Sequence, residues 1–268
     1  MIVPHIDAPR FLPRFTAPQL PPVIGHRGAA ARAPENTLAG LHRAKELGCT
    51  WVEFDVRLTA DGIPVLCHDP RLDRTTDGTG RIARLTFAAV RQCDAGARFD
   101  PAFAGELIPT LEEALLLCAE LGLGANIELK ADYSRDRDTA AAVAAILVRL
   151  NNWRPAVLVS SFRPWAFFRS PEVPRGMLFR MVPRNWSAFA ERFKCSVIGA
   201  DHRRLKRRRV AEMRDAGYQV AAFTVNDPAR ARLLFEWGVT SVFSDAPDIL
   251  LGINLGQSPV LMRQGAMR

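Results

Sequence analysis

The segment Trp51-Val52-Glu53-Phe54-Asp55-Val56-Arg57 decides how the rest of the chain can fold. Its aromatic and β-branched residues are typical of a strand, in which successive side chains leave opposite faces. Glu53 and Asp55 therefore share one face, and Val52, Phe54 and Val56 share the other. Two carboxylates this close together are costly to bury unless a cation lies between them. The segment predicts a strand with one metal-binding face and one hydrophobic face.

The composition is that of a globular protein of 268 residues, with 48% hydrophobic and 24% charged residues. No apolar run approaches the roughly 20 residues that cross a bilayer, so we expect no transmembrane segment. The net charge of +8 favours anionic partners. Because no nucleic-acid-binding motif accompanies this charge, we expect a small-molecule substrate and no nucleic acid partner.

Both ends of the chain are predicted to lie outside the folded domain. Residues 1–22 are rich in proline and lack the apolar core of a secretory signal, so we interpret them as an extended arm. Residues 251–268 form a C-terminal tail. The five cysteines are scattered without CxxC spacing, which is typical of reduced thiols and predicts a cytoplasmic protein. The sequence leaves the oligomeric state open.

A strand-then-helix pattern repeats eight times and predicts a (β/α)₈ TIM barrel over residues 23–250. A doubly wound open sheet is the alternative, but the first strand–helix turn lacks a GxGxxG fingerprint. The expected strands are 23–26, 51–57, 125–130, 156–161, 177–180, 197–200, 219–225 and 240–244. The expected helices are 36–48, 110–122, 138–151, 164–169, 186–193, 206–217, 227–237 and 247–252.

The segment 58–109 is too long for a simple connection between a strand and a helix. Residues 63–68 follow an Asp61-Gly62 turn and predict a strand that folds back on 51–57 as a hairpin. Long loops in compact domains are commonly lids or binding loops. We therefore expect a small insertion after the second strand, over the carboxyl-terminal mouth of the barrel, where barrel enzymes hold their active sites.

A third carboxylate joins the first two. In Asn126-Ile127-Glu128-Leu129-Lys130 polar and aliphatic residues alternate, so Glu128 faces the same interior as Glu53 and Asp55. Three carboxylates without a soft ligand favour Mg²⁺ or Ca²⁺. The alternative is an internal ion-pair network in which Arg27 and Lys130 neutralise the carboxylates without a metal.

Two histidines end predicted strands beside these carboxylates, His26 and His68. Histidine transfers protons near neutral pH, and a pair can serve as acid and base on opposite sides of a reacting centre. Arg27 offers a fork suited to phosphate oxygens. The basic run 203–209 is best explained as a solvated helix start, although it can also attract anionic substrates or lipid headgroups.

A series of short motifs extends from about residue 22 to residue 250. They are His26-Arg27-Gly28, Pro34-Glu35-Asn36-Thr37, Glu53-Phe54-Asp55-Val56, His68-Asp69-Pro70, residues 72–80, residues 108–113, Ile127-Glu128-Leu129-Lys130, Ser160-Ser161-Phe162, Thr224-Val225-Asn226 and Ser244-Asp245-Ala246-Pro247. In these motifs the chain resembles the glycerophosphodiester phosphodiesterase family. The resemblance implies a TIM barrel with an insertion after the second strand, and a Ca²⁺ or Mg²⁺ ion held by Glu53, Asp55 and Glu128. It also implies that His26 and His68 are the acid–base pair.

The same resemblance implies the reaction and the substrate-binding residues. The family cleaves glycerophosphodiesters such as glycerophosphocholine or glycerophosphoethanolamine to glycerol 3-phosphate and an alcohol, with the glycerol 2-hydroxyl as nucleophile. Family members often carry tryptophan where this chain has Phe223, so substrate preference can differ. The residues expected to contact the substrate are Arg27, Glu35, Lys130, Ser161, Phe223 and Asn226.

Two other functions fit the same core residues. A lysophospholipase D would need an exposed apolar rim, which Phe162, Trp165, Phe167 and Phe168 could form unless they pack into the core. A catalytically silent barrel that only binds phosphodiesters would tolerate loss of its histidines. We favour the enzyme because every residue that the family chemistry requires is present.

Overall fold

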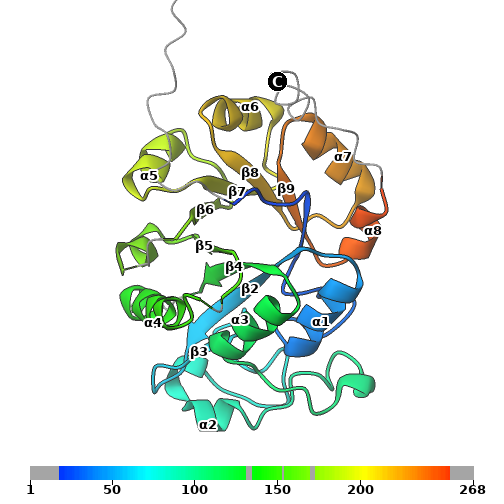
Figure 1. Cartoon of the computed structure of the whole chain (residues 1–268), viewed down its shortest axis with the longest axis vertical. Coiled ribbons are helices and arrows are strands. Elements are labelled where there is room, and N and C mark those ends of the chain that lie inside the picture. Colours follow the sequence, from blue (N-terminus) through cyan, green and yellow to red (C-terminus); the bar gives the residue numbers. More distant parts are fainter. Residues whose placement is uncertain (1–17, 131–134, 153, 170–172, 254–268) are drawn as a thin grey trace, which may run out of the picture.

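Eight parallel strands close into a barrel in the computed structural model, which describes residues 18–130, 135–152, 154–169 and 173–253. Figure 1 shows the strands surrounded by helices. The chain is therefore a (β/α)₈ TIM barrel, as the sequence predicts. The barrel strands are β1 (Val23–Gly25), β2 (Trp51–Leu58), β4 (Gly124–Leu129), β5 (Val157–Ser161), β6 (Arg175–Phe179), β7 (Val197–Asp201), β8 (Gln219–Phe223) and β9 (Ser241–Ser244).

The barrel closes through its shortest strand. β1 pairs with β9 along its whole length, and at Gly25 it also pairs with Val52 of β2. These two pairings join the first two strands of the chain to the last one. The first and last strands of the chain thus meet at one seam of the barrel.

The helices form the outer layer, and their positions agree with the eight predicted ones. The segment 164–169 differs in type, because it forms a 3-10 helix, η3 (Pro164–Arg169). No described helix has the length and apolar character needed to traverse a membrane. The remaining outer helices are α1 (Leu38–Glu46), α3 (Leu111–Glu120), α4 (Asp136–Arg149), α5 (Trp186–Arg192), α6 (Arg207–Asp215), α7 (Pro228–Glu236) and α8 (Pro247–Leu251).

The segment between β2 and α3 carries its own secondary structure. β3 (Pro64–Leu66) runs antiparallel to β2, with Val56 opposite Leu66. After it come η1 (Ile82–Arg84), α2 (Phe87–Val90) and η2 (Pro101–Phe103). A separate small core that includes Val65, Leu72 and Ile82 holds this segment together. In Figure 1 it lies on the side of the barrel that carries α1 and α3.

Side chains fill the barrel interior in layers. At the amino-terminal end of the strands, Ile24, Trp51 and Phe243 belong to one buried apolar cluster that Leu20 also joins. Gly124 makes room for the indole of Trp51, since an added Cβ would lie 2.2 Å from its ring. Because strand side chains alternate, the next inward positions on β2 are Glu53 and Asp55. The apolar layer thus forms a floor beneath a polar layer.

The outward face of β2 anchors this polar layer. Val52, Phe54 and Val56 are all fully buried in the main core between the strands and the surrounding helices. Burying side chains of this size stabilises a fold by about 1.5–3 kcal/mol each. The two faces of the strand therefore have separate roles, as the sequence predicts.

Nothing is described for the outermost ends of the chain. Residues 1–17 of the predicted arm and residues 254–268 of the predicted tail lie outside the described residues. The last part of the arm is described, and there the amide of Leu20 donates to the side chain of Gln219.

Candidate active site

Three carboxylates from two neighbouring strands converge inside the barrel. Glu53 and Asp55 leave β2, and Glu128 leaves β4 directly opposite Asp55 in the parallel register. All three are buried, with exposed fractions of 1%, 1% and 7%. Each offers an oxygen within 4.8 Å of the others, which suits a shared cation. The adjacent strands thus bring together the three residues that the sequence predicts as metal ligands.

The hydrogen bonding of these carboxylates also fits a cation. Glu53 Oε1 is buried and has no hydrogen-bond partner among the described residues, whereas Asp55 Oδ1 and Glu128 Oε1 both face the Lys130 ammonium. A buried oxygen without a partner costs about 1–3 kcal/mol, and more when it is charged. Carboxylate oxygens are the ligands that Mg²⁺ and Ca²⁺ prefer. The residues present therefore fit a hard divalent ion.

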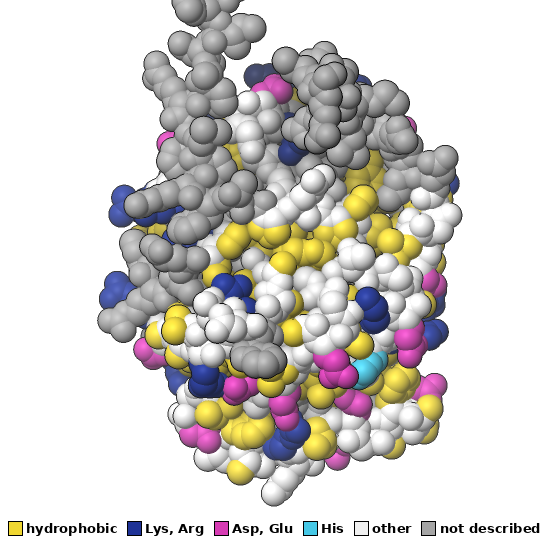
Figure 2. All heavy atoms as spheres, in the orientation of Figure 1, with side chains coloured by type: hydrophobic (Ala, Val, Ile, Leu, Met, Phe, Trp, Pro, Cys, Tyr) yellow, Lys and Arg dark blue, Asp and Glu magenta, His cyan; other side chains and the backbone are white. Residues whose placement is uncertain are grey.

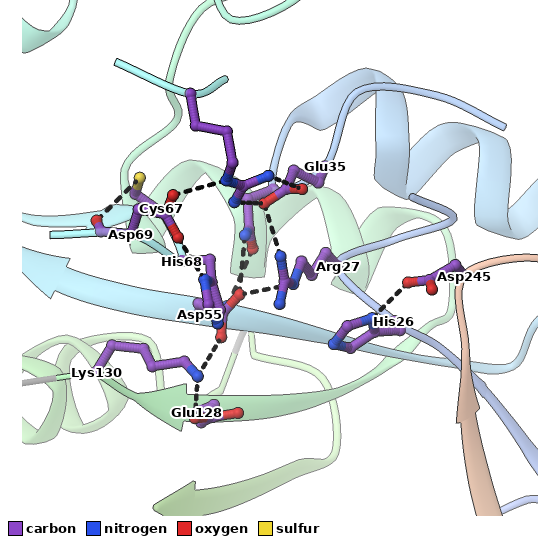
Figure 3. Close-up of polar contacts among 12 residues, drawn as sticks. His26, Arg27, Glu35, Asp55, Cys67, His68, Asp69, Glu128, Lys130 and Asp245 are labelled. Carbon is purple, nitrogen blue, oxygen red and sulfur yellow. Dashed lines mark hydrogen bonds and ion pairs between the residues drawn. The ribbon is translucent and has the colours of Figure 1, made fainter. Parts of the chain in front are cut away.

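Two cations lie beside the carboxylates but do not balance them. Lys130 Nζ is 2.6 Å from Glu128 Oε1 and 3.3 Å from Asp55 Oδ1. Arg27 Nε is 3.3 Å from Asp55 Oδ2. The ion-pair network considered from the sequence therefore exists, yet it sets two positive charges against three carboxyl groups. Figure 3 shows Lys130 and Arg27 on opposite sides of Asp55.

The surroundings separate the pKa values of the three carboxyl groups. Burial raises the pKa of Glu128 to about 7 and raises that of Glu53 well above its usual value, with the neighbouring carboxylates adding to the shift at Glu53. Burial acts on Asp55 too, but Lys130 and Arg27 outweigh it and lower its pKa to about 2. The metal-free site thus favours one ionised carboxylate and holds protons on its neighbours, which a divalent cation would displace.

His26 follows β1 at the barrel seam. Its Nδ1 lies 2.6 Å from Asp245 Oδ1, and its Nε2 lies 3.8 Å from Glu53 Oε2. Asp245 follows β9, the strand that pairs with β1. Burial opposes ionisation of Asp245, but its hydrogen bond with His26 and their mutual attraction lower its pKa. The carboxylate therefore accepts the Nδ1 proton, which leaves Nε2 facing the metal-site residues (Figure 3).

His68 stands at the end of the hairpin and has the same kind of partner. Its Nδ1 lies 2.6 Å from Asp69 Oδ1. The guanidinium of Arg57 fixes the backbone, donating to the His68 carbonyl at 2.9 and 2.6 Å. Burial lowers the pKa of His68, and the nearby positive charge of Lys130 adds to this shift. The environment of His68 thus favours the neutral imidazole over the imidazolium.

The loop after β1 carries a polar network that supports the site. The Asn36 amide donates to Asp55 Oδ2 at 3.0 Å, and its carbonyl accepts from the Asp55 amide at 3.0 Å. The Arg27 amide donates to Glu53 Oε2 at 3.0 Å. Both Arg27 and Asn36 have positive φ angles, of 51° and 58°. This backbone conformation is unfavourable for residues other than glycine, and its occurrence at two site residues is typical of a functional loop.

Arg74 ties the segment after β2 to this loop. Its guanidinium donates to Glu35 at 2.7 and 2.8 Å and to Asp69 Oδ2 at 2.6 Å. Glu35 also accepts from Arg27 at 2.9 Å. The predicted substrate residue Glu35 is therefore engaged by two arginines, and the segment 58–109 reaches the active site through His68, Asp69 and Arg74.

The other predicted substrate residues differ in their accessibility. Ser161 is fully buried, and its hydroxyl donates to the Leu129 carbonyl at 3.2 Å. The half-buried ring of Phe223 stands edge-on to Phe162 with centroids 5.5 Å apart. The Lys130 ammonium lies 5.5 Å from the Phe162 ring centroid. Phe223 and Phe162 thus form an aromatic wall beside Lys130. The Ser161 hydroxyl is instead used in its hydrogen bond to the Leu129 carbonyl.

Asn226 supports Asp245. Its amide donates to Asp245 Oδ2 at 2.8 Å, and its carbonyl accepts from the Asp245 amide at 2.8 Å. The sequence predicts Asn226 as a substrate contact, and its contacts in the structure orient the partner of His26.

Sequence reasoning assigned no role to Asp69, Asp245, Asn36 and Arg74. Asp69 follows His68 directly, and Asp245 follows the last strand, so both carried a usable signal. An acidic residue that comes next to a strand-end histidine, or ends a strand neighbouring it, can orient its ring. No local sequence pattern predicts the contacts of Asn36 and Arg74, because these contacts depend on two loops folding together.

The aromatic residues after β5 do not all form an exposed rim. Phe167 is buried in the core, and Phe162 belongs to the wall just described, whereas Trp165 is 52% exposed. The side chain of Phe168 lies outside the described residues. Core packing therefore accounts for part of this segment, with Trp165 as the exposed exception.

Comparison with known proteins shows which family the chain belongs to. Residues 26–249 match the model of the glycerophosphoryl diester phosphodiesterase family. The glycerophosphodiester phosphodiesterase of Caldanaerobacter subterraneus is 30% identical over 86% of this chain and 96% of its own length. Human glycerophosphodiester phosphodiesterase 1 is 37% identical, over 61% of this chain and 49% of its own.

A solved structure is more similar still. The phosphodiesterase of Oleispira antarctica, solved in complex with the product sn-glycerol-3-phosphate, is 39% identical with a TM-score of 0.84. The similarity covers 87% of this chain and 96% of that one. Together with the barrel and its buried carboxylates, these matches show that the chain belongs to the glycerophosphodiester phosphodiesterase family.

Proposed function

We propose that this enzyme hydrolyses glycerophosphodiesters such as glycerophosphocholine or glycerophosphoethanolamine to glycerol 3-phosphate and an alcohol. The observation that carries the proposal is the pairing of both histidines with carboxylates beside the three-carboxylate site. Each Nδ1 is engaged, so each Nε2 is left to exchange a proton with the substrate. The product bound by the Oleispira relative supports glycerol 3-phosphate as the product here.

A divalent ion, Ca²⁺ or Mg²⁺, would be held by Glu53, Asp55 and Glu128. When bound it supplies Lewis-acid stabilisation of the charge on a phosphate oxygen. Lys130 and Arg27 lie on either side of this position and add positive charge where the phosphate would bind. Together these groups favour a dianionic transition state over a monoanionic ground state.

The two histidines transfer the protons. In the first step one Nε2 accepts the proton of the glycerol 2-hydroxyl while that oxygen bonds to phosphorus. The other Nε2 donates a proton to the departing alcohol, and a cyclic phosphate remains. In the second step a water molecule opens the ring, and the two histidines exchange roles. Acid and base catalysis each contribute about 10²–10⁴-fold.

The test is release of glycerol 3-phosphate from glycerophosphocholine by the purified chain, before and after EDTA treatment and after adding Ca²⁺ or Mg²⁺. We expect turnover that chelation abolishes and one of the ions restores. Turnover that EDTA leaves unchanged, or the absence of turnover with every glycerophosphodiester, contradicts the proposal. A substrate without the 2-hydroxyl should not react, and full turnover of it rules out the cyclic phosphate.

A lysophospholipase D is the second candidate, and the exposure of Trp165 in the segment after β5 favours it. Lysophosphatidylcholine differs from glycerophosphocholine by one acyl chain, so a comparison of kcat/KM for the two substrates separates the candidates. A higher value for the acylated substrate supports the lipid enzyme.

The free state of all five cysteines supports a cytoplasmic location, which cell fractionation tests.

A further inference from the structure

A buried asparagine without hydrogen-bond partners lies beside the three carboxylates. Asn126, in the middle of β4, is 0% exposed. Neither its Oδ1 nor its Nδ2 has a hydrogen-bond partner among the described residues, and no other described residue has two such buried side-chain atoms. The buried Nε atoms of Arg154 and Arg175 also have none, but each of these guanidinium groups donates through another nitrogen. Because buried polar groups are almost always hydrogen-bonded, Asn126 needs a partner other than the described residues.

The register of the strands gives the direction of this side chain. In the parallel pairing of β2 and β4, Asn126 lies opposite Glu53, and Glu128 lies opposite Asp55. Residues two apart on a strand share a face, so Asn126 leaves β4 on the same side as Glu128. That side is the interior of the barrel, where the three carboxylates meet. Asn126 therefore points into the candidate metal site, next to Glu53.

Other unpartnered polar atoms lie at the same place. Glu53 Oε1 has no hydrogen-bond partner among the described residues, and neither has the hydroxyl of Ser160; both residues are 1% exposed. Ser160 lies opposite Glu128 in the pairing of β4 and β5. Three neighbouring strands thus direct unpartnered polar atoms into one part of the barrel. A common partner for oxygens from several strands is a bound cation.

Carboxylates on the surface differ from those inside the barrel. On the face that Figure 2 shows, acidic side chains lie in the open, and several stand next to lysine or arginine side chains. Water or a basic neighbour can satisfy their oxygens there. Inside the barrel, Lys130 contacts Glu128 and Asp55, and Arg27 contacts Asp55. None of these ion pairs involves Glu53 Oε1 or Asn126.

The carboxamide of Asn126 has suitable chemistry for the same ion. Ca²⁺ binds about six to eight oxygens, and asparagine carbonyls are among its usual ligands together with carboxylates. Mg²⁺ is smaller, requires a nearly ideal octahedron and usually keeps several waters in place of protein ligands. A fourth protein oxygen therefore favours the larger ion. The NH₂ group of the same side chain can donate to Glu53 Oε1, its neighbour in register.

We propose that Asn126 Oδ1 is a fourth protein ligand of the divalent ion and makes the site selective for Ca²⁺ over Mg²⁺. This inference rests on the ion that the proposed function assigns to Glu53, Asp55 and Glu128. Because an amide is neutral, Asn126 adds an oxygen without adding negative charge. The ion therefore keeps the positive charge with which it attracts the phosphate of the substrate.

The first experiment counts the water ligands of Tb³⁺, which replaces Ca²⁺ in oxygen sites and whose luminescence decay in H₂O and D₂O reports them. In the full chain, Asn126→Ala leaves room for a water molecule and should raise this number by about one. Asn126→Asp keeps an oxygen at the position and should retain the number of the wild type. The control is Ser241→Ala at the start of β9, which removes a buried hydroxyl that donates to the Pro21 carbonyl at 2.7 Å.

The second experiment measures the selectivity by calorimetric titration with Ca²⁺ and with Mg²⁺. Asn126→Ala should weaken Ca²⁺ binding by at least about tenfold, the lower limit for residues that support metal ligands, and Mg²⁺ binding by less. Asn126→Asp should bind Ca²⁺ at least as tightly as the wild type. Ser241→Ala should bind both ions like the wild type. Circular dichroism checks that each variant is folded, and Asn126→Asp carries the test if Asn126→Ala does not fold.

The possible failures are distinguishable. A wild-type chain that binds none of the three ions contradicts the proposed metal site itself, and the inference about Asn126 with it. A wild-type chain that binds them, with the same number of bound waters in Asn126→Ala, overturns only the role of Asn126 as a ligand. Equal weakening of Ca²⁺ and Mg²⁺ binding in Asn126→Ala overturns the selectivity.

Discussion

His26 Nδ1 lies 2.6 Å from Asp245 Oδ1, although 219 residues separate them in the sequence. A hydrogen bond at this position fixes the tautomer of the ring and stabilises the imidazolium that forms during proton transfer. His68 has an equivalent partner in Asp69. The proposed acid–base pair thus consists of two histidines that each contact a carboxylate of their own.

Asp245→Asn should lower kcat for glycerophosphocholine by about 10²–10⁴-fold, the contribution of a correctly oriented acid–base group. KM should change little, because Asp245 does not touch the substrate in the proposed arrangement. Steady-state kinetics measures both, and ¹⁵N NMR of the imidazole reports the tautomer of His26. The control is Asp248→Asn on the same segment, which loses only a partly exposed ion pair with Arg32. An equal loss of kcat in both variants would mean that Asp245→Asn disturbs the structure of this segment and does not act through His26.

Removal of the metal should make the stability of the protein depend on pH through Glu128. Its pKa lies at about 7 in the folded chain against an ordinary value of 4.5, because of burial. Below pH 4.5 the carboxyl group of Glu128 is protonated in both the folded and the unfolded chain. As the pH rises above 4.5, the unfolded chain loses this proton at a lower pH than the folded chain does. The free energy of unfolding of the metal-free protein should therefore fall as pH rises from 4.5 to about 7.

Urea unfolding in EDTA across this range measures the slope, and Glu128→Gln should reduce it. The same variant should lose metal affinity in calorimetric titration, as should Glu53→Gln and Asp55→Asn. Glu112→Gln, which removes an exposed pair with Arg149, is the control for both measurements. Unchanged metal affinity in all three site variants would make the carboxylates structural.

Arg74→Lys should impair catalysis although it keeps the charge. The lysine ammonium cannot reproduce a fork that contacts Glu35 and Asp69 together. We expect a loss of about 10–100-fold in kcat/KM, typical of residues that orient catalytic groups. Because Asp69 orients His68, the pH profile of kcat should shift as well. Arg71→Lys, whose fork binds the exposed Asp73, should leave both unchanged.

Only Cys93 should react quickly with a thiol reagent in the native protein. Burial raises the pKa of Cys49, Cys67, Cys118 and Cys195 to about 12, so their reactive thiolates are scarce. Cys93 is the partly exposed one. Titration with a chromogenic disulfide should count one thiol before denaturation and five after it, as the chain contains five cysteines. Cys93→Ser should abolish the fast phase.

The fold was accessible from the sequence because periodicity carries it. Alternation at Glu53, Asp55 and Glu128 predicted the inward positions, and the same alternation predicted the buried outer face of β2. Patterns of this kind are local, so they survive without knowledge of tertiary contacts. The short helix at 164–169 was placed correctly, but its 3-10 geometry depends on packing that no periodicity encodes.

The supporting residues were harder to predict because their roles arise between segments. Asn226 is predicted as a substrate contact, and the structure adds a contact that the sequence did not indicate, the hydrogen bond from its amide to Asp245. Arg74 lies in a loop without regular structure, and only the folded segment after β2 brings it to Glu35. Sequence patterns thus identify the groups that react more readily than the groups that orient them.

The closure of the barrel through β1 sets the order in which the active site becomes complete during protein synthesis. Glu53, Asp55 and Glu128 have all been synthesised once β4 is complete. His26 is synthesised before any of them, yet it acquires its carboxylate only when β9 has emerged and Asp245 follows it. A nascent chain therefore contains all three carboxylates of the site long before it contains the residue that orients its first histidine.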